Sequence, residues 1–218
     1  MDEDAYTIPR QRMVKEQLRE RDIDDPRVLE AMSLVPRHVF VPPEHRELAY
    51  ADGPLPIGAN QTISQPYMVA LMTQLLELSG DEIVLEVGTG SGYQAAVLAH
   101  LARRVHTIER HANLARLAAR LLADLGLDNV TVHVGDGSRG LPEFSPYQAI
   151  LVTAAAPQVP PALLEQLAEA GRLVIPVGGQ NGQTLERWVR QGPGFKREDH
   201  GMVAFVPLLG EFGWQNHD

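Results

Sequence analysis

The segment Val84–Ala99, V-L-E-V-G-T-G-S-G-Y-Q-A-A-V-L-A, has residue types and spacing suited to holding a ligand. A buried strand passes here through a glycine-rich turn into a helix, and Gly88, Gly90 and Gly92 let a ligand approach the main chain without meeting a side chain. A dinucleotide-binding turn would place its third glycine one position later, beside a pyrophosphate. That position is Tyr93. The spacing therefore favours a nucleotide-type ligand that lacks a pyrophosphate.

Acidic residues at the ends of three expected strands narrow the choice of ligand. Glu86, just before the turn, would repel phosphate and suit a cationic amino group. Glu109 follows about 20 residues later, where a carboxylate can accept both hydroxyls of a ribose. Asp136 could accept from the amino group of an adenine, while Gly137 leaves room for the ring. S-adenosylmethionine meets these conditions together.

Each of these features also has an ordinary structural explanation. The glycines could form a tight turn and nothing more, because short motifs recur by chance. Glu109 could be a solvated charge at a strand end, and Asp136-Gly137 is a common turn sequence. The order and spacing of all three features favour the ligand site over three separate coincidences.

The elements that would position these residues alternate between strand and helix from residue 83 onward. Helical patterns begin at Tyr93, His111 and Pro161, and the region 135–148 has only a weak pattern. This alternation predicts an α/β fold with a Rossmann-like, seven-stranded, mostly parallel sheet covered by helices on both faces. Five apolar runs are expected as parallel strands, and two further runs around a Q-G-P-G turn as an antiparallel pair: Ile83–Val87, Val105–Ile108, Val130–Val134, Ala149–Thr153, Leu173–Val177, Gln183–Val189 and Met202–Leu208.

The first 80 residues have a different character. Two helical patterns occupy Ile8–Val41, and Asp25-Pro26 is a start signal for the second. Asp52–Gln65 contains Pro and Gly without any helical or strand period, so we expect a loop, followed by an apolar helix over Tyr67–Leu78. We predict one domain over 1–218, with an N-terminal helical cap and active-site loop in 1–80 and the ligand-binding α/β core in 81–218.

Composition restricts the partners and the compartment. The chain has 218 residues and a formal net charge of -9, which disfavours nucleic acid as a partner. It has no Cys, starts with the acidic M-D-E-D-A-Y and lacks an apolar run of about 20 residues, so we expect a cytoplasmic monomer without membrane contact. The eight His are scattered without an H-E-x-x-H pattern, and no G-x-S-x-G occurs. We therefore expect neither a metal site nor a serine esterase.

Nearly the whole chain resembles protein-L-isoaspartate O-methyltransferases. The glycine turn is common to many methyltransferases, whereas Q-T-I-S-Q-P-Y-M-V-A at Gln61–Ala70 and V-T-A-A-A-P-Q-V-P-P-A-L-L-E-Q-L at Val152–Leu167 are specific to this family. G-R-L-V-I-P-V-G at Gly171–Gly178 and F-V-P-L at Phe205–Leu208 also match. Gln65 and Tyr67 depart from the family's usual Ala and His, and the tail after Leu209 diverges.

The resemblance implies the class I methyltransferase sheet with a family-specific order of its last strands. It implies S-adenosylmethionine as methyl donor, S-adenosylhomocysteine as product, and methyl transfer to isoaspartyl residues of damaged peptides and proteins, which initiates repair through a succinimide. Ser64 occupies the position of the family's active-site serine. We expect the cofactor to contact Thr62, Ile63, Ser64, Glu86, Gly88, Thr89, Gly90, Gly92, Glu109, Arg110, Asp136, Gly137 and Thr153, and the substrate to contact Ile63, Ser64, Pro66, Tyr67, Ala154 and Ala155.

This chemistry needs positioning more than acid or base catalysis. A carboxylate is almost fully ionised at pH 7, so no general base is required. Ser64 could donate a hydrogen bond to the substrate, or could instead be the N-cap of the following helix. Tyr67 is expected to form a wall. The alternatives are a class I methyltransferase with a different small-molecule or protein acceptor, and a catalytically silent protein that binds S-adenosylmethionine.

Overall fold

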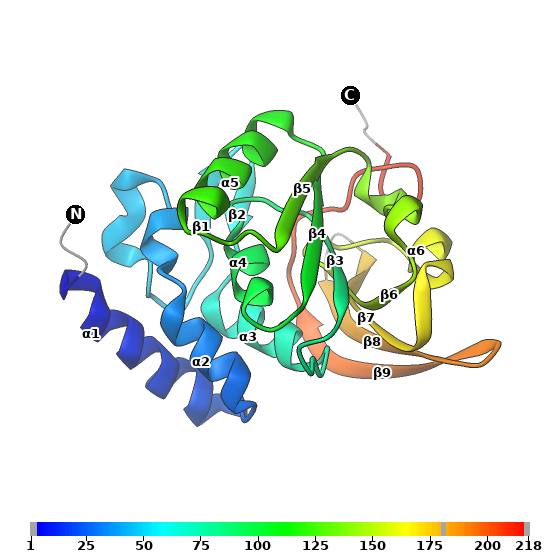
Figure 1. Ribbon diagram of the computed structural model, residues 1–218, viewed down its shortest axis with the longest axis horizontal. Helices are drawn as coiled ribbons and strands as arrows, with labels where there is room; N and C mark the ends of the chain where they lie inside the picture. The colour runs from blue at the N-terminus through cyan, green and yellow to red at the C-terminus, as the bar shows by residue number, and fades with distance from the viewer. Residues whose placement is uncertain (1–3, 180–181, 216–218) are drawn as a thin grey trace.

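The computed structural model describes residues 4–179 and 182–215, so the extreme ends of the predicted 1–218 unit lie outside the described residues. Its centre is a seven-stranded sheet in the order β5-β4-β3-β6-β7-β8-β9 (Figure 1). The first five of these strands are mutually parallel, whereas β8 and β9 are antiparallel to their neighbours. The predicted mostly parallel sheet is confirmed. Its strands are β3 (Ile83–Val87), β4 (Arg104–Glu109), β5 (Val130–Val134), β6 (Tyr147–Val152), β7 (Leu167–Gly179), β8 (Gly182–Gln191) and β9 (Gly194–Val203).

Helices cover both faces of the sheet, as Figure 1 shows. On one face, Val84 and Val105 belong to a core shared with α3 (Pro66–Gln74), α4 (Tyr93–Ala99) and α5 (Ala112–Asp124). On the other face, Leu85 and Ile150 pack with Leu163 of α6 (Pro161–Glu165). Successive strand residues point to opposite faces, so a strand buried on both sides is apolar throughout. This is why the central strands could be recognised as continuous apolar runs.

The N-terminal region forms the predicted helical cap over the α4 face. A helical run comprises α1 (Asp4–Arg12), the π-helical η1 (Met13–Leu18) and the 3₁₀ turn η2 (Arg19–Arg21). Helix α2 (Pro26–Leu34) starts at the predicted signal, because the Asp25 carboxylate accepts hydrogen bonds from the backbone N–H groups of Arg27 and Val28. Buried residues of the N-terminal helices and of the α/β core belong to one hydrophobic cluster, which extends from Met13 to Leu185. None of the helices described is long and apolar enough to cross a membrane.

Short 3₁₀ turns connect several of these elements. In the weakly patterned region 135–148 they replace a crossover helix, as the sequence suggested. The two turns of this region are η5 (Gly137–Arg139) and η6 (Pro142–Phe144). Two further turns, η3 (Arg37–Phe40) and η4 (Pro43–Leu48), follow α2.

Two predicted elements are wrong. The expected loop at Asp52–Gln65 contains an antiparallel hairpin of β1 (Leu55–Gly58) and β2 (Gln61–Ile63). Its turn residues Ala59 and Asn60 have positive φ values of 50° and 56°, a backbone typical of tight hairpin turns. The hairpin was missed because its strands are short and contain Pro and Gly.

The last strand was placed too late in the sequence. We expected Met202–Leu208, whereas β9 begins at Gly194, directly after the Gly192-Pro193 turn. Half of the residues of β9 are polar, and β9 is an edge strand held by its ladder with β8, so a hydrophobic period did not reveal it. The apolar stretch after β9 crosses the carboxyl end of the sheet, where Pro207 forms an isolated parallel bridge with Ala155.

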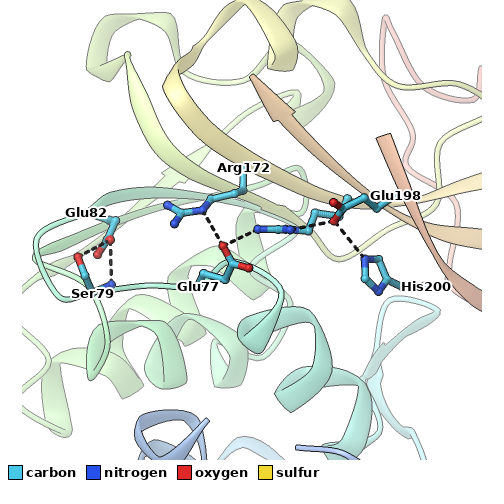
Figure 2. A network of polar contacts seen from close by, with 7 residues as sticks. Glu77, Ser79, Glu82, Arg172, Glu198 and His200 are labelled. Atoms are coloured by element: carbon cyan, nitrogen blue, oxygen red, sulfur yellow. Dashed lines mark hydrogen bonds and ion pairs between the residues drawn. The ribbon is translucent and has the colours of Figure 1, made fainter. Parts of the chain in front are cut away.

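Arg187 of β8 links the antiparallel end of the sheet to the loop after α3 through Glu77 and Glu198, which Figure 2 labels. Its side chain is only 12% exposed and lies 2.6 Å from Glu77 Oε2 and 2.8 Å from Glu198 Oε2. Arg172 of β7 also approaches Glu77, at 3.6 Å. We name Glu77, Arg172, Arg187 and Glu198 the hairpin brace.

Candidate active site

The carboxyl ends of β3, β4 and β6 open into a cavity whose empty space, including its open mouth, is about 800 Å³. The glycine turn forms one side, and residues 61–64 and 206–209 form others. Among the predicted site residues, the wall contains Thr62, Ile63, Ser64, Gly88, Thr89, Gly90, Glu109, Arg110, Gly137, Thr153 and Ala154.

The glycine turn brings the ends of β3 and β6 into close contact. Gly88 has φ 98° and Gly90 has φ 53°, conformations that favour glycine. Thr153 Oγ1 donates to the carbonyl oxygen of Gly88 at 2.7 Å, and a methyl group on Gly88 would overlap that hydroxyl. Gly92 has a packing role outside the wall, because a Cβ there would lie 3.2 Å from Ala118 Cβ of α5.

Glu109, the last residue of β4, holds its carboxylate at the cavity wall. Its Oε2 accepts from the backbone N–H of Gly90 at 3.0 Å, and its Oε1 accepts from the backbone N–H of His111 at 2.9 Å. Each carboxylate oxygen can accept a further hydrogen bond. Glu109 thus keeps acceptor capacity at the cavity wall, and its contact with ribose hydroxyls stays a prediction.

Glu86 lies below the turn, and the expectation that it meets a cationic amino group directly is not met. Its side chain is 0% exposed, and Thr107 Oγ1 donates to its Oε2. Thr107 in turn lies 2.6 Å from the hydroxyl of Thr89, a residue of the wall. Burial, reinforced by the charge of Glu109, raises the pKa of Glu86 to about 8. Glu86 thus supports the turn from inside the protein, because β3 is covered on both faces.

Gly137 lies in the wall, whereas its neighbour Asp136 is not among the residues of the described wall, and its contact with the cofactor stays a prediction. A Cβ on Gly137 would come within 2.5 Å of Val87 Cγ1, so a side chain there would not fit. Asp136 Oδ1 accepts from the backbone N–H and the hydroxyl of Ser138, and Oδ2 accepts from the backbone N–H of Glu211 at 2.8 Å. Ile108, Leu208 and Leu209 supply apolar wall beside Gly137.

Ser64 lies in the wall, and its interpretation as an N-cap is wrong. The N-cap position of α3 belongs to Gln65, whose side-chain amide donates to Asp52 Oδ1 at 2.6 Å and does not cap the helix. The helix reaches one residue closer to Ser64 than expected because Pro66 is its first residue. The cavity position of Ser64 is thus independent of a capping role.

The two family departures, Gln65 and Tyr67, belong to one cluster beside Ser64. Arg21 lies 2.7 Å from Asp52 Oδ2, and its guanidinium carbon lies 4.1 Å from the centroid of the Tyr67 ring. Asp52 also accepts from Gln65. Pro66 is buried, and both it and Tyr67 lie outside the described cavity wall.

Ala155 also lies outside the described wall, and its backbone is already engaged. Its N–H donates to the carbonyl of Val206 and its carbonyl accepts from the N–H of Leu208, both at 2.8 Å. The expectation that Ala155 contacts the substrate is therefore not met by its backbone. The wall residues missed by sequence reasoning are Gln61, Val69, Val87, Ser91, Tyr93, Gln94, Ile108, His111 and Val206–Leu209. The family motif F-V-P-L at Phe205–Leu208 could have indicated that residues 206–208 belong to the site.

The cavity suits an S-adenosyl nucleoside. The glycine turn provides a wall of backbone, Glu109 provides acceptors for a ribose, and Gly137 leaves room for a base beside the apolar Ile108. No cluster of three or more His, Cys, Asp or Glu that could hold a metal occurs among the described residues. This fold and this site define a class I S-adenosylmethionine-dependent methyltransferase.

Comparison with known proteins gives the family. The family model for protein-L-isoaspartate(D-aspartate) O-methyltransferases matches residues 9–213, and the chain belongs to this family. It is 58% identical over 207 residues to protein-L-isoaspartate O-methyltransferase 1 of Syntrophobacter fumaroxidans, covering 94% of this chain and 96% of that one. The corresponding enzyme of Geobacter metallireducens is 57% identical over 210 residues, with 96% and 97% covered.

Solved structures agree with this assignment. One protein-L-isoaspartate O-methyltransferase superimposes with a TM-score of 0.84 at 28% identity, covering 94% of this chain and 67% of that one. A Plasmodium falciparum β-aspartate methyltransferase, in complex with S-adenosyl-L-homocysteine, gives 0.80 at 27% identity, with 92% and 98% covered. In this chain the last strands lie in the order β7-β8-β9.

Proposed function

We propose that this protein transfers a methyl group from S-adenosylmethionine to the free carboxylate of isoaspartyl residues in damaged proteins and peptides. Its membership of the family over residues 9–213 supports this activity. The structural observation that carries the proposal is that Ser64, the glycine turn and Glu109 share one cavity. The residues that would hold the cofactor and the family's active-site serine thus line the same cavity, where a bound methyl donor and a substrate carboxylate could meet.

The glycine turn and Glu109 would hold the cofactor. When bound, S-adenosylmethionine supplies an electrophilic methyl group on a sulfonium, which a carboxylate oxygen can take by displacement. Gly88 and Gly90 would contact its amino-acid part through the backbone, and Glu109 would accept from its ribose hydroxyls. Asp136 would accept from the adenine amino group at the edge next to Gly137. Apolar residues around Gly137 would exclude water from the base.

Ser64 and the start of α3 would hold the substrate carboxylate. The first backbone N–H groups of a helix have no intrahelical partner and carry a partial positive charge, which favours an anion by about 0.3–1 kcal/mol at an exposed site. The Ser64 hydroxyl would add one donor. No proton has to be removed, because a side-chain carboxylate is ionised at neutral pH. The chain's contribution is therefore orientation and exclusion of water.

Selection between isomers must depend on geometry, because isoaspartyl and aspartyl carboxylates have similar basicity. In the isoaspartyl form the chain runs through the side-chain carbon, which displaces the free carboxylate by a methylene relative to the gripped backbone. We infer that residues 63–67 provide the grip, since both backbone groups of Ala155 are engaged by residues 206–208. The methyl ester would then lose methanol as the neighbouring backbone nitrogen closes a succinimide, which begins repair.

We further propose a cytoplasmic monomer of one domain that does not act on nucleic acid or membranes. The net charge of -9 supports the first exclusion, because such a field repels a phosphate backbone. A hydrophobic cluster shared by the cap and the α/β core supports a single folding unit. Sedimentation at micromolar concentration would test the monomer, and a dimer would contradict it.

Initial rates with an isoaspartyl peptide and its aspartyl twin, at saturating S-adenosylmethionine, test the function. We expect the aspartyl peptide to react at least about 10²-fold more slowly, since a misplacement of about 1 Å can cost that factor. Methanol should appear after the methyl ester without further enzyme. Equal rates for the two peptides would contradict a repair enzyme, and cofactor binding without transfer to either would favour a silent binding protein.

A further inference from the structure

The C-terminal loop Leu208–Trp214 forms a closed turn above the carboxyl end of the sheet. The backbone N–H of Trp214 donates to the carbonyl of Leu208 at 2.7 Å. Gly210 N–H donates to the carbonyl of Trp214, and Gly213 N–H donates to the carbonyl of Gly210, both at 3.2 Å. These hydrogen bonds give the loop a defined shape of its own. We name residues 208–214 the tail loop.

The tail loop is attached to both borders of the cavity. On the β5 side, Glu211 N–H donates to Asp136 Oδ2 at 2.8 Å, and Phe212 N–H donates to Ser138 Oγ at 3.0 Å. The Ser138 hydroxyl in turn donates a hydrogen bond to Asp136 Oδ1 at 2.7 Å. On the β6 side, the Trp214 indole N–H donates to the carbonyl of Ala155 at 3.1 Å. Both oxygens of the Asp136 carboxylate are thus held, one directly and one through Ser138.

We propose that the tail loop sets the base specificity of the cofactor site by fixing the Asp136 carboxylate. The inference rests on the proposed function, in which Asp136 accepts from the adenine amino group. A deaminated purine presents a carbonyl oxygen at that position, and two acceptors facing each other are unfavourable. A carboxylate free to rotate could avoid this repulsion. One held by the tail loop and Ser138 cannot, so it discriminates between amino and oxo purines.

Gly210 is the point at which this attachment can be disturbed. A methyl group on Gly210 would overlap Asp136 Oδ1 and would lie 2.7 Å from Asp136 Cγ and 2.5 Å from Ser138 Oγ. The φ of Gly210 lies outside the left-handed region, so alanine can adopt its backbone conformation. Gly210→Ala should therefore displace the Asp136 carboxylate with little backbone strain. Gly194→Ala at the β8–β9 turn is the matched control, since its methyl would meet only the Gln191 carbonyl oxygen at 3.9 Å.

Calorimetry with S-adenosylhomocysteine and its deaminated analogue, S-inosylhomocysteine, tests the proposal. We expect the unmodified protein and Gly194→Ala to bind the adenine ligand at least about tenfold more tightly, the effect of one hydrogen bond to a charged group. Gly210→Ala should reduce this preference to less than about threefold, mainly by weakening the adenine ligand. Ser138→Ala removes the hydroxyl between Phe212 and Asp136 and should act in the same direction.

A preference that is unchanged in folded Gly210→Ala and Ser138→Ala would overturn the proposal, as would an equal loss of affinity for both ligands, which indicates a merely structural role. Melting curves establish folding, and if Gly210→Ala does not fold, Ser138→Ala decides. Methylation of an isoaspartyl peptide by the unmodified protein is measured in parallel. Normal methylation without any base preference would overturn the inference and leave the proposed function in place.

Discussion

Ser64 lies in the cavity wall one residue before the N-cap of α3, so its hydroxyl can be tested for catalysis without loss of a helix cap. We expect Ser64→Ala to lower turnover about 10- to 100-fold, because a hydrogen bond to a charged group contributes about 1.5–3 kcal/mol. The melting temperature and the affinity for S-adenosylhomocysteine should stay nearly unchanged. Steady-state kinetics and a melting curve provide the check, and full turnover would remove Ser64 from the substrate site.

Glu86 gives a pH dependence of stability with a defined sign. Burial raises its folded-state pKa to about 8, above an unfolded value of about 4.3, so the folded protein binds more protons between these values. The contribution of Glu86 to stability is therefore complete below about pH 4 and is lost as the pH rises to 8. Glu86→Gln cannot titrate, so its stability relative to the unmodified protein should increase from pH 5 to pH 8.

Urea denaturation at pH 5, 6, 7 and 8 measures this difference, whose slope should not exceed about 1.4 kcal/mol per pH unit. Gln can still accept from Thr107, which makes it the closest replacement for a protonated Glu. Parallel stability curves for the two proteins would show that Glu86 does not titrate in this range.

At the scale of elements, the hairpin brace joins the loop after α3 to strands β7, β8 and β9, as Figure 2 shows. A hydrogen bond from Lys196, and next one from Arg187 of the brace, hold the pKa of Glu198 down to about 2. Arg187→Met would leave Glu77 without its 2.6 Å partner and Glu198 without its 2.8 Å partner. We expect the melting temperature to fall by several degrees with the cofactor affinity unchanged, because the brace lies outside the described cavity wall.

Arg12→Met is the control for this prediction. Arg12 pairs with Glu16 within a helical run, and its side chain is 72% exposed, compared with 12% for Arg187. An exposed pair of this kind contributes little to stability. Calorimetric melting of both variants makes the comparison, and equal effects would show that the position of Arg187 between elements is unimportant.

At the scale of the molecule, ligand binding should stabilise the fold, because the cavity joins the ends of β3, β4 and β6 to the β1–β2 hairpin. S-adenosylhomocysteine at 100 times its dissociation constant should add about 2.7 kcal/mol, which raises the melting temperature by roughly 5–10 °C. S-adenosylmethionine should have a similar effect, since the contacts address parts common to both ligands. Product inhibition should follow.

Glu109→Ala shows whether the ribose contact contributes to this stabilisation. We expect at least about a tenfold weaker affinity, and so about 1.4 kcal/mol less stabilisation at a fixed ligand concentration. Thermal shift assays over a range of ligand concentrations measure both quantities. An unchanged affinity in a folded variant would place the ribose elsewhere.

The core of the sheet and the order of the site residues along it could be predicted from the amino-acid pattern. Strands β3 and β6 are buried on both faces and therefore appear as apolar runs, and the glycine turn at 88–92 directly follows β3. Parallel strands end at the same edge of a sheet, so Glu109, Gly137 and Thr153 could be expected in one crevice. These features depend on local pattern and on the rules of strand connection.

The tertiary structure alone decided which side chains reach the cavity. Glu86 has the sequence position of a ligand-binding acid, yet a strand covered on both faces keeps it buried beside Thr107. Strand β9 is held by backbone pairing with β8. Such pairing does not require an alternation of apolar residues, so the sequence of β9 contains no hydrophobic period that could be detected. The tail loop reaches Asp136 through hydrogen bonds between residues 75 positions apart. Contacts across such separations follow from how the elements pack, so they cannot be predicted from the local spacing of residues.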